Sequence, residues 1–520
     1  MKKQGVFHGA VVLAVAGFIV KVLGALFKIP LGAMLGPEGN GIFSIAHNIY
    51  ALIFVIATAG IPVAMSKIVA EVEAKGENSK IVFKKALILF AVMGLTLAAV
   101  LFLGAKPFAS LMGAESAERA IQTFAPAIFF VSIAALIRGY FQGFSNMIPT
   151  AVSEIIEAAS KLVFGIGALY FLIKKGSGVQ TLAAGAIVGV TAGTAISTLY
   201  LLAKSRRNLS KNTLQPEKGV VARLVKTALP ITMGAAVVSL SNVIDSGIVM
   251  NILKRVGVSP DRALWFFGSY NYATTVFNLP GFLITTLGIS LIPTVSGACV
   301  LGKYKEMSSL CENAMKLMLS LACAAAGGLF ALSEPILILL YGGVDSDAIE
   351  LSANLLKILA LAVPTLALSS LSAALLQGLG DVRKPMYSMC VGAACKVFFN
   401  FLLVSIPNVG IYGAAASTVI CYGITCVMNL CFLSKKRRIA LCFSRILFFP
   451  TLAGIFPTLS AKFIFSHLLP QMGSLGAIIV TVVCSLLLWG VCIMLFGVVR
   501  KVDINRLFNR KGITFFSKNH

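Results

Sequence analysis

Charged residues are scarce in this chain of 520 residues: only 12% are Asp, Glu, Lys or Arg, whereas 58% are apolar. A soluble globular protein would carry about a quarter charged residues. The mean hydropathy of +0.92 points the same way. The composition excludes a soluble domain and indicates a protein embedded in a lipid bilayer.

Signatures of catalysis, metal binding and nucleotide hydrolysis are also lacking. The chain has only four histidines, and its apolar stretches contain no paired His and carboxylate arrangement. All eleven cysteines lie between Cys299 and Cys492 without CxxC or Cys/His metal spacing, so we interpret them as small reduced apolar side chains. No GxxxxGK[ST] run occurs. We therefore expect neither an enzyme nor a metal or organic cofactor.

Long apolar stretches are what the chain has in abundance. About 20 apolar residues suffice to cross a bilayer as a helix. A cleavable signal peptide is not expected, because the first stretch contains Lys21 and Lys28 and runs into further spans. The predicted fold is an all-α polytopic membrane protein. Its fourteen predicted spans are 8–29, 42–66, 83–104, 120–141, 151–173, 182–203, 228–251, 264–292, 313–332, 352–377, 387–405, 411–433, 446–467 and 475–498.

Proline and glycine landmarks recur in the same order about 230 residues apart. This period carries six spans, an even number, so both copies enter the membrane from the same side and form parallel repeats. Spans 13 and 14 are an appended pair. The paired landmarks are Pro62 with Pro293, Pro107 with Pro335, Pro126 with Pro364, Gln142 and Gly143 with Gln377 and Gly378, and Pro149 with Pro385. The predicted domains are an N-lobe (1–203), a basic linker (204–227), a C-lobe (228–433), the appended pair (434–498) and a basic tail (499–520).

The distribution of Lys and Arg predicts the orientation. With the N-terminus inside, the termini and loops on that side hold 29 of the 44 basic residues, and the opposite side holds seven. Basic residues are retained on the cytoplasmic side of a membrane. Both termini are therefore expected in the cytoplasm. The net charge of +25 mostly records this asymmetry and an attraction to anionic membrane lipids, and no nucleic-acid partner is expected.

The other eight basic residues lie inside predicted spans, where a charge costs about 2.5–3.5 kcal/mol near the bilayer centre. Such a residue either faces a partner or wet cavity or snorkels to the interface. Lys21 lies deepest and is the leading candidate for a cavity cation, whereas Lys28 and Arg138 suit either reading. Arg138 is a candidate substrate or gate residue as well as a helix anchor. Snorkelling is favoured for Lys316, Lys357 and Lys462, and Lys161 and Lys396 complete the set.

Acidic and amide side chains suggest two further roles. Asp245 is the only acid near the middle of a span, so it is a candidate for ion coupling with Na⁺ or H⁺, or for a structural hydrogen bond. Asn400 and Thr418 could supply oxygen ligands near it. Glu157 and Lys161 share one helical face and, with Glu154, form either an inward gate or an interfacial ion pair.

Span 8 is unusually polar before its helix-interrupting Pro280. The density of these side chains favours the lining of an aqueous cleft that widens as the helix bends. Hydrogen bonding between helices is the alternative. The polar residues are Tyr270, Asn271, Tyr272, Thr274, Thr275 and Asn278.

Four segments of the chain resemble the multidrug/oligosaccharidyl-lipid/polysaccharide (MOP) exporter superfamily. The resemblance is to its branch of stage V sporulation protein B and MurJ-like lipid II flippases. The resemblance covers essentially the whole chain. The segments that carry it are LGPEGNGIFSIAHNIYALIFVIATAGIPVAMSKIVAEV (35–72), RGYFQGFSNMIPTAVSEIIEAASKL (138–162), NLPGFLITTLGISLIPTVS (278–296) and the QGLGDVRKP run near 380.

The resemblance implies a V-shaped, MATE-like transporter of two six-helix lobes that flips an undecaprenyl-diphosphate-linked cell-wall precursor, lipid II or a close relative, to the outer leaflet by alternating access. Helices 13 and 14 would hold the lipid tail, and Lys21 stands where MurJ-type proteins carry a cavity arginine. A headgroup cavity would comprise Lys21, Lys28, Arg138, Asn48, Tyr270, Asn271 and Asn278.

The chain departs from the branch at two places. Where MurJ-like members carry further arginines, helix 2 has His47 and Asn48, and span 8 has Thr274 and Thr275. His47 can also be an interfacial residue. These departures favour a similarity to the sporulation-type members of the branch. Two other functions stay open: export of another polyprenyl-linked polysaccharide, and cation-coupled multidrug antiport. We expect a monomer in the bacterial cytoplasmic membrane, with cell-wall synthesis enzymes as candidate partners.

Overall fold

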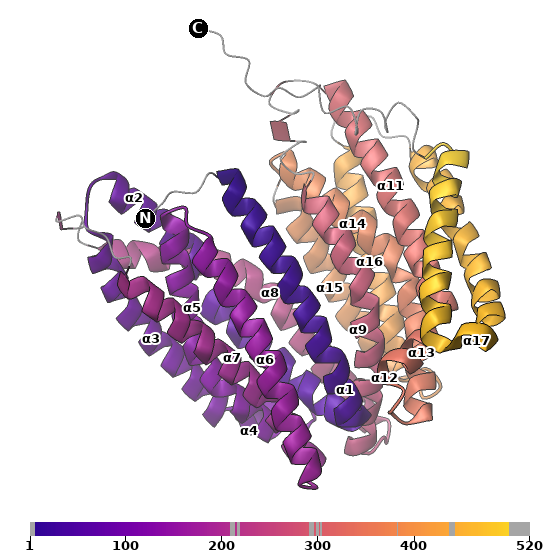
Figure 1. The fold of residues 1–520 in the computed structure, drawn as a ribbon, viewed down its shortest axis with the longest axis horizontal. Coiled ribbons are helices and arrows are strands. Elements are labelled where there is room, and N and C mark those ends of the chain that lie inside the picture. Colours follow the sequence, from indigo (N-terminus) through magenta and orange to yellow (C-terminus); the bar gives the residue numbers. More distant parts are fainter. Residues whose placement is uncertain are drawn as a thin grey trace. The chain divides into compact units, whose positions relative to one another are not determined.

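The computed structural model describes residues 6–207, 214–215, 219–290, 296–297, 301, 304–381, 383–435 and 443–498. Within those residues the chain is helical apart from turns and one isolated bridge between Glu77 and Leu214. The helices form two compact units by their contacts (Figure 1). The first unit comprises Met1–Asn271 with Leu340–Ala348, and the second comprises Tyr272–Leu339 with Ile349–His520.

The first unit is built around α5 (Glu118–Gly143), most of whose residues are buried. It packs against α1, α2, α3 and α7. Tyr140 of α5 lies 4.6 Å from the ring of Phe83 in α3, inside the principal apolar core of this unit. The helices of the first unit are α1 (Val6–Thr58), α2 (Ile61–Ala74), α3 (Ser79–Leu103), α4 (Ala105–Leu111), η1 (Glu115–Ala117), α5, α6 (Ile148–Lys174), α7 (Val179–Arg207), α8 (Val220–Arg255) and the first part of α9 (Pro260–Ser290).

Helix α1 is two helices joined at Gly36, whose φ of 67° and ψ of 176° interrupt the helical backbone. A positive φ is strained for residues with a Cβ atom, so glycine suits this break. Asn40, just after it, donates a hydrogen bond to the carbonyl oxygen of Gly268 in α9 at 2.9 Å. The break therefore divides one continuous apolar run into two spans. The hydrogen bond of Asn40 attaches the second span to α9.

Glycines also set the distance between α6 and α7. A Cβ atom at Gly193 would lie 2.6 Å from the carbonyl oxygen of Glu157, and one at Gly189 would lie 2.6 Å from that of Lys161. Small residues let membrane helices approach backbone to backbone. The α6 turns that carry Glu157 and Lys161 are therefore held directly against α7.

In the second unit α14 packs against α11 and α16, and α17 packs against α11. Gly473, with φ 71° and ψ 172°, divides α17 into two helices that run side by side in yellow in Figure 1. The helices that lie wholly or mostly in this unit are the rest of α9, α11 (Tyr304–Ala331), α12 (Ser333–Tyr341), α13 (Ser346–Ala360), α14 (Ala362–Gly378), α15 (Arg383–Val404), α16 (Tyr412–Ser434) and α17 (Phe443–Leu495).

The order of elements supports the predicted duplication. In each half a long helix (α3 or α11) is followed by a short helix that contains a landmark proline, Pro107 in α4 or Pro335 in α12. Pro126 and Pro364 then fall in the next long helices, α5 and α14. Pro293 lies outside the described residues.

Length and composition identify eleven candidate membrane spans in the described part of the chain, or twelve if the bent pair of α13 and α14 is one span. One of the eleven, Val11–Ala74, contains the second predicted span and all of the first except residues 8–10. The all-α polytopic membrane fold is confirmed, whereas the count of fourteen stays a prediction. The lobe boundaries stay predictions too. The tail 499–520 and the linker residues 208–213 and 216–218 lie outside the described residues.

Candidate substrate site

One face of the first half of α1 carries two lysines. Lys21 and Lys28 are two helical turns apart and therefore lie on the same face, where Lys21 is exposed and Lys28 is half-buried. A Cβ atom at Gly17 or Gly24, on the same side, would meet no heavy atom of the described chain within 4 Å. This stretch of α1 thus presents positive charge on an uncovered surface of the first unit.

The second half of α1 presents His47 and Asn48. The exposed His47 ring lies 5.9 Å from the ring of Phe43 and 6.2 Å from that of Phe124 in α5. These contacts hold the imidazole against buried aromatic rings. Asn48 instead donates a hydrogen bond to the Ser246 hydroxyl of α8 at 3.3 Å, so its amide links two helices of the first unit.

Arg138 is the centre of a hydrogen-bonded network that joins three helices. Its guanidinium forms an ion pair with Glu157 of α6 at 2.8 Å. It also donates to the hydroxyls of Ser153 at 3.0 Å and of Ser197, in α7, at 3.3 Å. The side chains of Arg138 and Glu157 are only 13% and 20% exposed. Glu154 interacts electrostatically with Arg138 from one turn away on α6.

The sequence spacing placed Glu157 and Lys161 on one helical face, and the structure gives Glu157 a different ion-pair partner. Lys161 forms no ion pair with a carboxylate in the described residues, and its ammonium lies 5.8 Å above the ring of Phe27 in α1. Glu157 still acts on Lys161 electrostatically. The proposed gate of Glu154, Glu157 and Lys161 therefore contains Arg138 as a fourth member.

The residues proposed for ion coupling belong to different units. Asp245, half-buried in α8, lies in the first unit beside Ser246, whereas Asn400 of α15 and Thr418 of α16 lie in the second. Asn400 accepts a hydrogen bond from the Ser417 hydroxyl, next to Thr418. The described residues contain no group of three or more His, Cys, Asp or Glu that could hold a metal ion. The ion site stays a prediction.

The polar residues of α9 differ in their surroundings. Tyr270 is buried, Asn271 is half-buried, and Asn278 is exposed. The unit boundary falls between Asn271 and Tyr272. Their role in a headgroup cavity stays a prediction.

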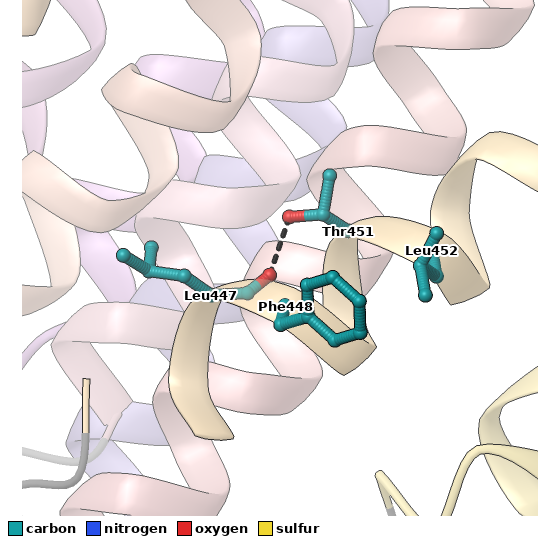
Figure 2. Close-up of a pocket in the computed structure, with 4 residues that line it drawn as sticks. All are labelled: Leu447, Phe448, Thr451 and Leu452. Atoms are coloured by element: carbon teal, nitrogen blue, oxygen red, sulfur yellow. Dashed lines mark hydrogen bonds between the residues drawn. The ribbon is translucent and has the colours of Figure 1, made fainter. Parts of the chain in front are cut away.

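An apolar pocket that the sequence had not singled out lies on the first half of α17. It is wide open to its surroundings rather than an enclosed cavity, and Figure 2 shows the four residues that line it, Leu447, Phe448, Thr451 and Leu452. The Thr451 hydroxyl donates to the carbonyl oxygen of Leu447 at 2.6 Å, which satisfies its donor within the helix. The pocket surface is therefore hydrocarbon. It lies in the appended pair that the resemblance associates with a lipid tail.

The sequence also did not predict that Arg138, Glu157, Ser153 and Ser197 form one network. Its sequence signals were an arginine in the fourth span and two acids at the start of the fifth. The serines that complete it, Ser153 and Ser197, carry no signal of their own, because isolated serines are common in membrane helices.

Comparisons with known proteins agree with this architecture. The family model described as "Polysaccharide biosynthesis protein" matches residues 6–298, and the MatE model matches 230–402. The lipid II flippase MurJ of Bacillus subtilis is 28% identical over 80% of this chain and 80% of its own length. Stage V sporulation protein B of the same organism is 27% identical over 85% and 86%. A solved structure titled lipid II flippase MurJ, inward closed conformation, has a TM-score of 0.72 at 16% identity, covering 94% of this chain and 98% of that one.

Proposed function

This chain belongs to the polysaccharide biosynthesis protein family, in the MurJ-like branch of the MOP exporter superfamily, and from that membership we propose that it flips a lipid-linked cell-wall precursor across the bacterial cytoplasmic membrane. It is a multi-pass membrane transporter rather than an enzyme. The proposed cargo is an undecaprenyl-diphosphate-linked saccharide, lipid II or a close relative, used in peptidoglycan or spore-cortex synthesis. Both termini are proposed to be cytoplasmic.

The observation that carries the proposal is the cationic face of α1, which lies in a chain that resembles flippases along most of its length. Lys21 is exposed on this face and Lys28 lies two turns further on. Ammonium groups form charge-assisted hydrogen bonds with phosphate oxygens. An anionic headgroup therefore has donors on the first unit, and the apolar pocket at Leu447 and Phe448 on α17 offers a hydrocarbon surface for part of a polyprenyl chain.

Leaflet transfer by the purified protein is the direct test. Proteoliposomes that contain a fluorescent polyprenyl-diphosphate-linked disaccharide should expose their inner-leaflet lipid to a membrane-impermeant quencher much faster than protein-free liposomes, because the protein supplies a polar path for the headgroup. Chemical analysis of the recovered lipid should show it unaltered. A rate equal to that of protein-free liposomes would contradict the proposed function.

A second candidate, a cation-coupled multidrug antiporter, is favoured by the MatE match over 230–402. The same liposomes distinguish the two, since an antiporter would export small organic cations and leave the lipid in its leaflet. The basic side chains of α1 argue against organic cations as cargo, because like charges repel.

We further propose that transport is coupled to Na⁺ or H⁺ through Asp245. Replacing Asp245 with asparagine keeps the size of the side chain and removes its charge, so the dependence of the transfer rate on an imposed ion gradient should be largely lost. The rate without a gradient is the internal control. An unchanged gradient dependence would remove Asp245 from the mechanism.

A further inference from the structure

Helix α8 belongs to one half of the molecule by sequence and to the other by contact. The duplication predicts span 7, at 228–251, as the first helix of the C-lobe. In the structure α8 lies in the first unit and packs against α1, α2 and α3. Transporters built from two repeats work by moving one repeat against the other. A helix shared in this way is a candidate for the element that changes partners.

The inner end of α8, nearest the basic linker, is built into the principal apolar core of the first unit. Val220, Leu224 and Ala228 recur every four residues and therefore share one helical face. They are 6%, 0% and 6% exposed and belong to the same core cluster as Ile68 and Val72 of α2. This face holds the inner end of α8 against α2.

An ion pair lies beside the apolar contact. The guanidinium of Arg223 lies 2.9 Å from the carboxylate of Glu71 in α2, and the two side chains are 45% and 38% exposed. Lys67 approaches the same carboxylate from within α2, at 4.0 Å. An exposed ion pair contributes little to stability, because water solvates both charges when they separate. Arg223 and Glu71 can therefore part and pair again easily.

The middle of α8 makes no comparable contact. None of the described residues between Ala228 and Ser246 is buried. Near the opposite end, Asn251 donates a hydrogen bond to the carbonyl oxygen of Leu111 at 2.9 Å. Pro230, two residues past Ala228, removes a backbone hydrogen bond, and prolines inside helices are common points of bending. The inner end can therefore leave α2 by bending at Pro230 while the opposite end stays attached.

We propose that the inner end of α8 is a releasable clasp on α2, formed by Val220, Arg223, Leu224 and Ala228, and that its ion pair with Glu71 opens in each transport cycle. The inference rests on the proposed function, because a headgroup that enters from the cytoplasmic side needs an opening between helices at that side. The clasp is closed in this structure.

Distances between spin labels test whether the clasp opens. The labels are attached at Ala70→Cys on α2 and Lys226→Cys on α8, in the full-length protein with its native cysteines replaced. Both positions are exposed and leave Arg223 and Glu71 intact. Pulsed electron paramagnetic resonance in nanodiscs should show a short and a long distance, whose proportions change when a polyprenyl-diphosphate-linked disaccharide is added. The control pair Ala70→Cys/Lys85→Cys, between α2 and α3, should give one distance.

The ion pair can be tested without disturbing the apolar contact. Arg223→Gln should raise the ratio of open to closed clasp about two- to fivefold, the shift that corresponds to an exposed ion pair. Lys67→Gln is the matched control and should leave the ratio unchanged, because Lys67 reaches Glu71 from α2 itself. Exchanging the charges in Glu71→Arg/Arg223→Glu should restore most of the wild-type ratio. An unchanged ratio in Arg223→Gln would remove the ion pair from the clasp.

A covalent link tests whether transport requires the opening. A short, reducible bifunctional thiol reagent can join Glu71→Cys to Arg223→Cys, whose native side chains meet in the ion pair. The linked protein should transfer lipid only at the protein-free rate, and reduction of the reagent should restore transfer. The same reagent placed across Lys67→Cys and Ala70→Cys, one turn apart within α2, should leave the rate unchanged.

The possible failures are distinguishable. A single label distance in every condition, or full transfer by the protein linked from α2 to α8, would overturn the clasp and leave the proposed function standing. If the unlinked protein transfers no lipid, the proposed function fails. Two label distances would in that case still support the clasp as an element that opens, and a single distance would overturn it as well.

Discussion

Lys21→Ala is expected to abolish growth complementation in cells that lack their own flippase, while the protein still inserts into the membrane. Lys21 is exposed on the uncovered face of α1, so its truncation removes a charge and little packing. The loss of a charged hydrogen bond to the headgroup corresponds to about 10- to 100-fold weaker binding. Complementation and the leaflet-transfer rate of the purified variant are the two measurements.

Two variants accompany this test. Lys21→Arg keeps the charge and should retain transport. Lys85→Ala removes an exposed lysine from the start of α3, outside the proposed site, and should complement like the wild type. Normal growth of the Lys21→Ala strain, with transport by the pure protein unimpaired, would remove Lys21 from the headgroup site.

The all-α fold could be predicted from apolar run length because a bilayer offers few alternatives to the helix. Run length also placed the first break approximately, because the predicted spans 8–29 and 42–66 leave a gap at 30–41 and the break at Gly36 lies inside it. Its position depends on a single positive φ that glycine permits. Repeated prolines gave better landmarks, as Pro107 and Pro335 do fall in equivalent short helices.

The candidate site could be predicted only in part. Helical periodicity placed Glu157 and Lys161 on one face of α6, because that relation is local. The pairing of Glu157 with Arg138 joins residues of two helices, and no local rule reveals it. The proposed ligands Asp245, Asn400 and Thr418 were grouped by chemistry alone, and they lie in different units.

Arg138→Ala is expected to lower the free energy of unfolding by on the order of 3 kcal/mol, because removal of one partner leaves the other charge buried and unpaired. Glu157 is only 20% exposed, and Ser153 and Ser197 would lose their guanidinium donor as well. The unfolding midpoint in detergent, compared with that of the wild type, measures the effect. A midpoint within error of the wild-type value would show that the network does not stabilise the first unit.

The double variant Arg138→Ala/Glu157→Gln tests whether the unpaired carboxylate causes the loss of stability. It leaves no unpaired carboxylate at position 157, so it should recover a substantial part of the lost stability. A double variant no more stable than Arg138→Ala would show that the charge left on Glu157 does not cause the loss.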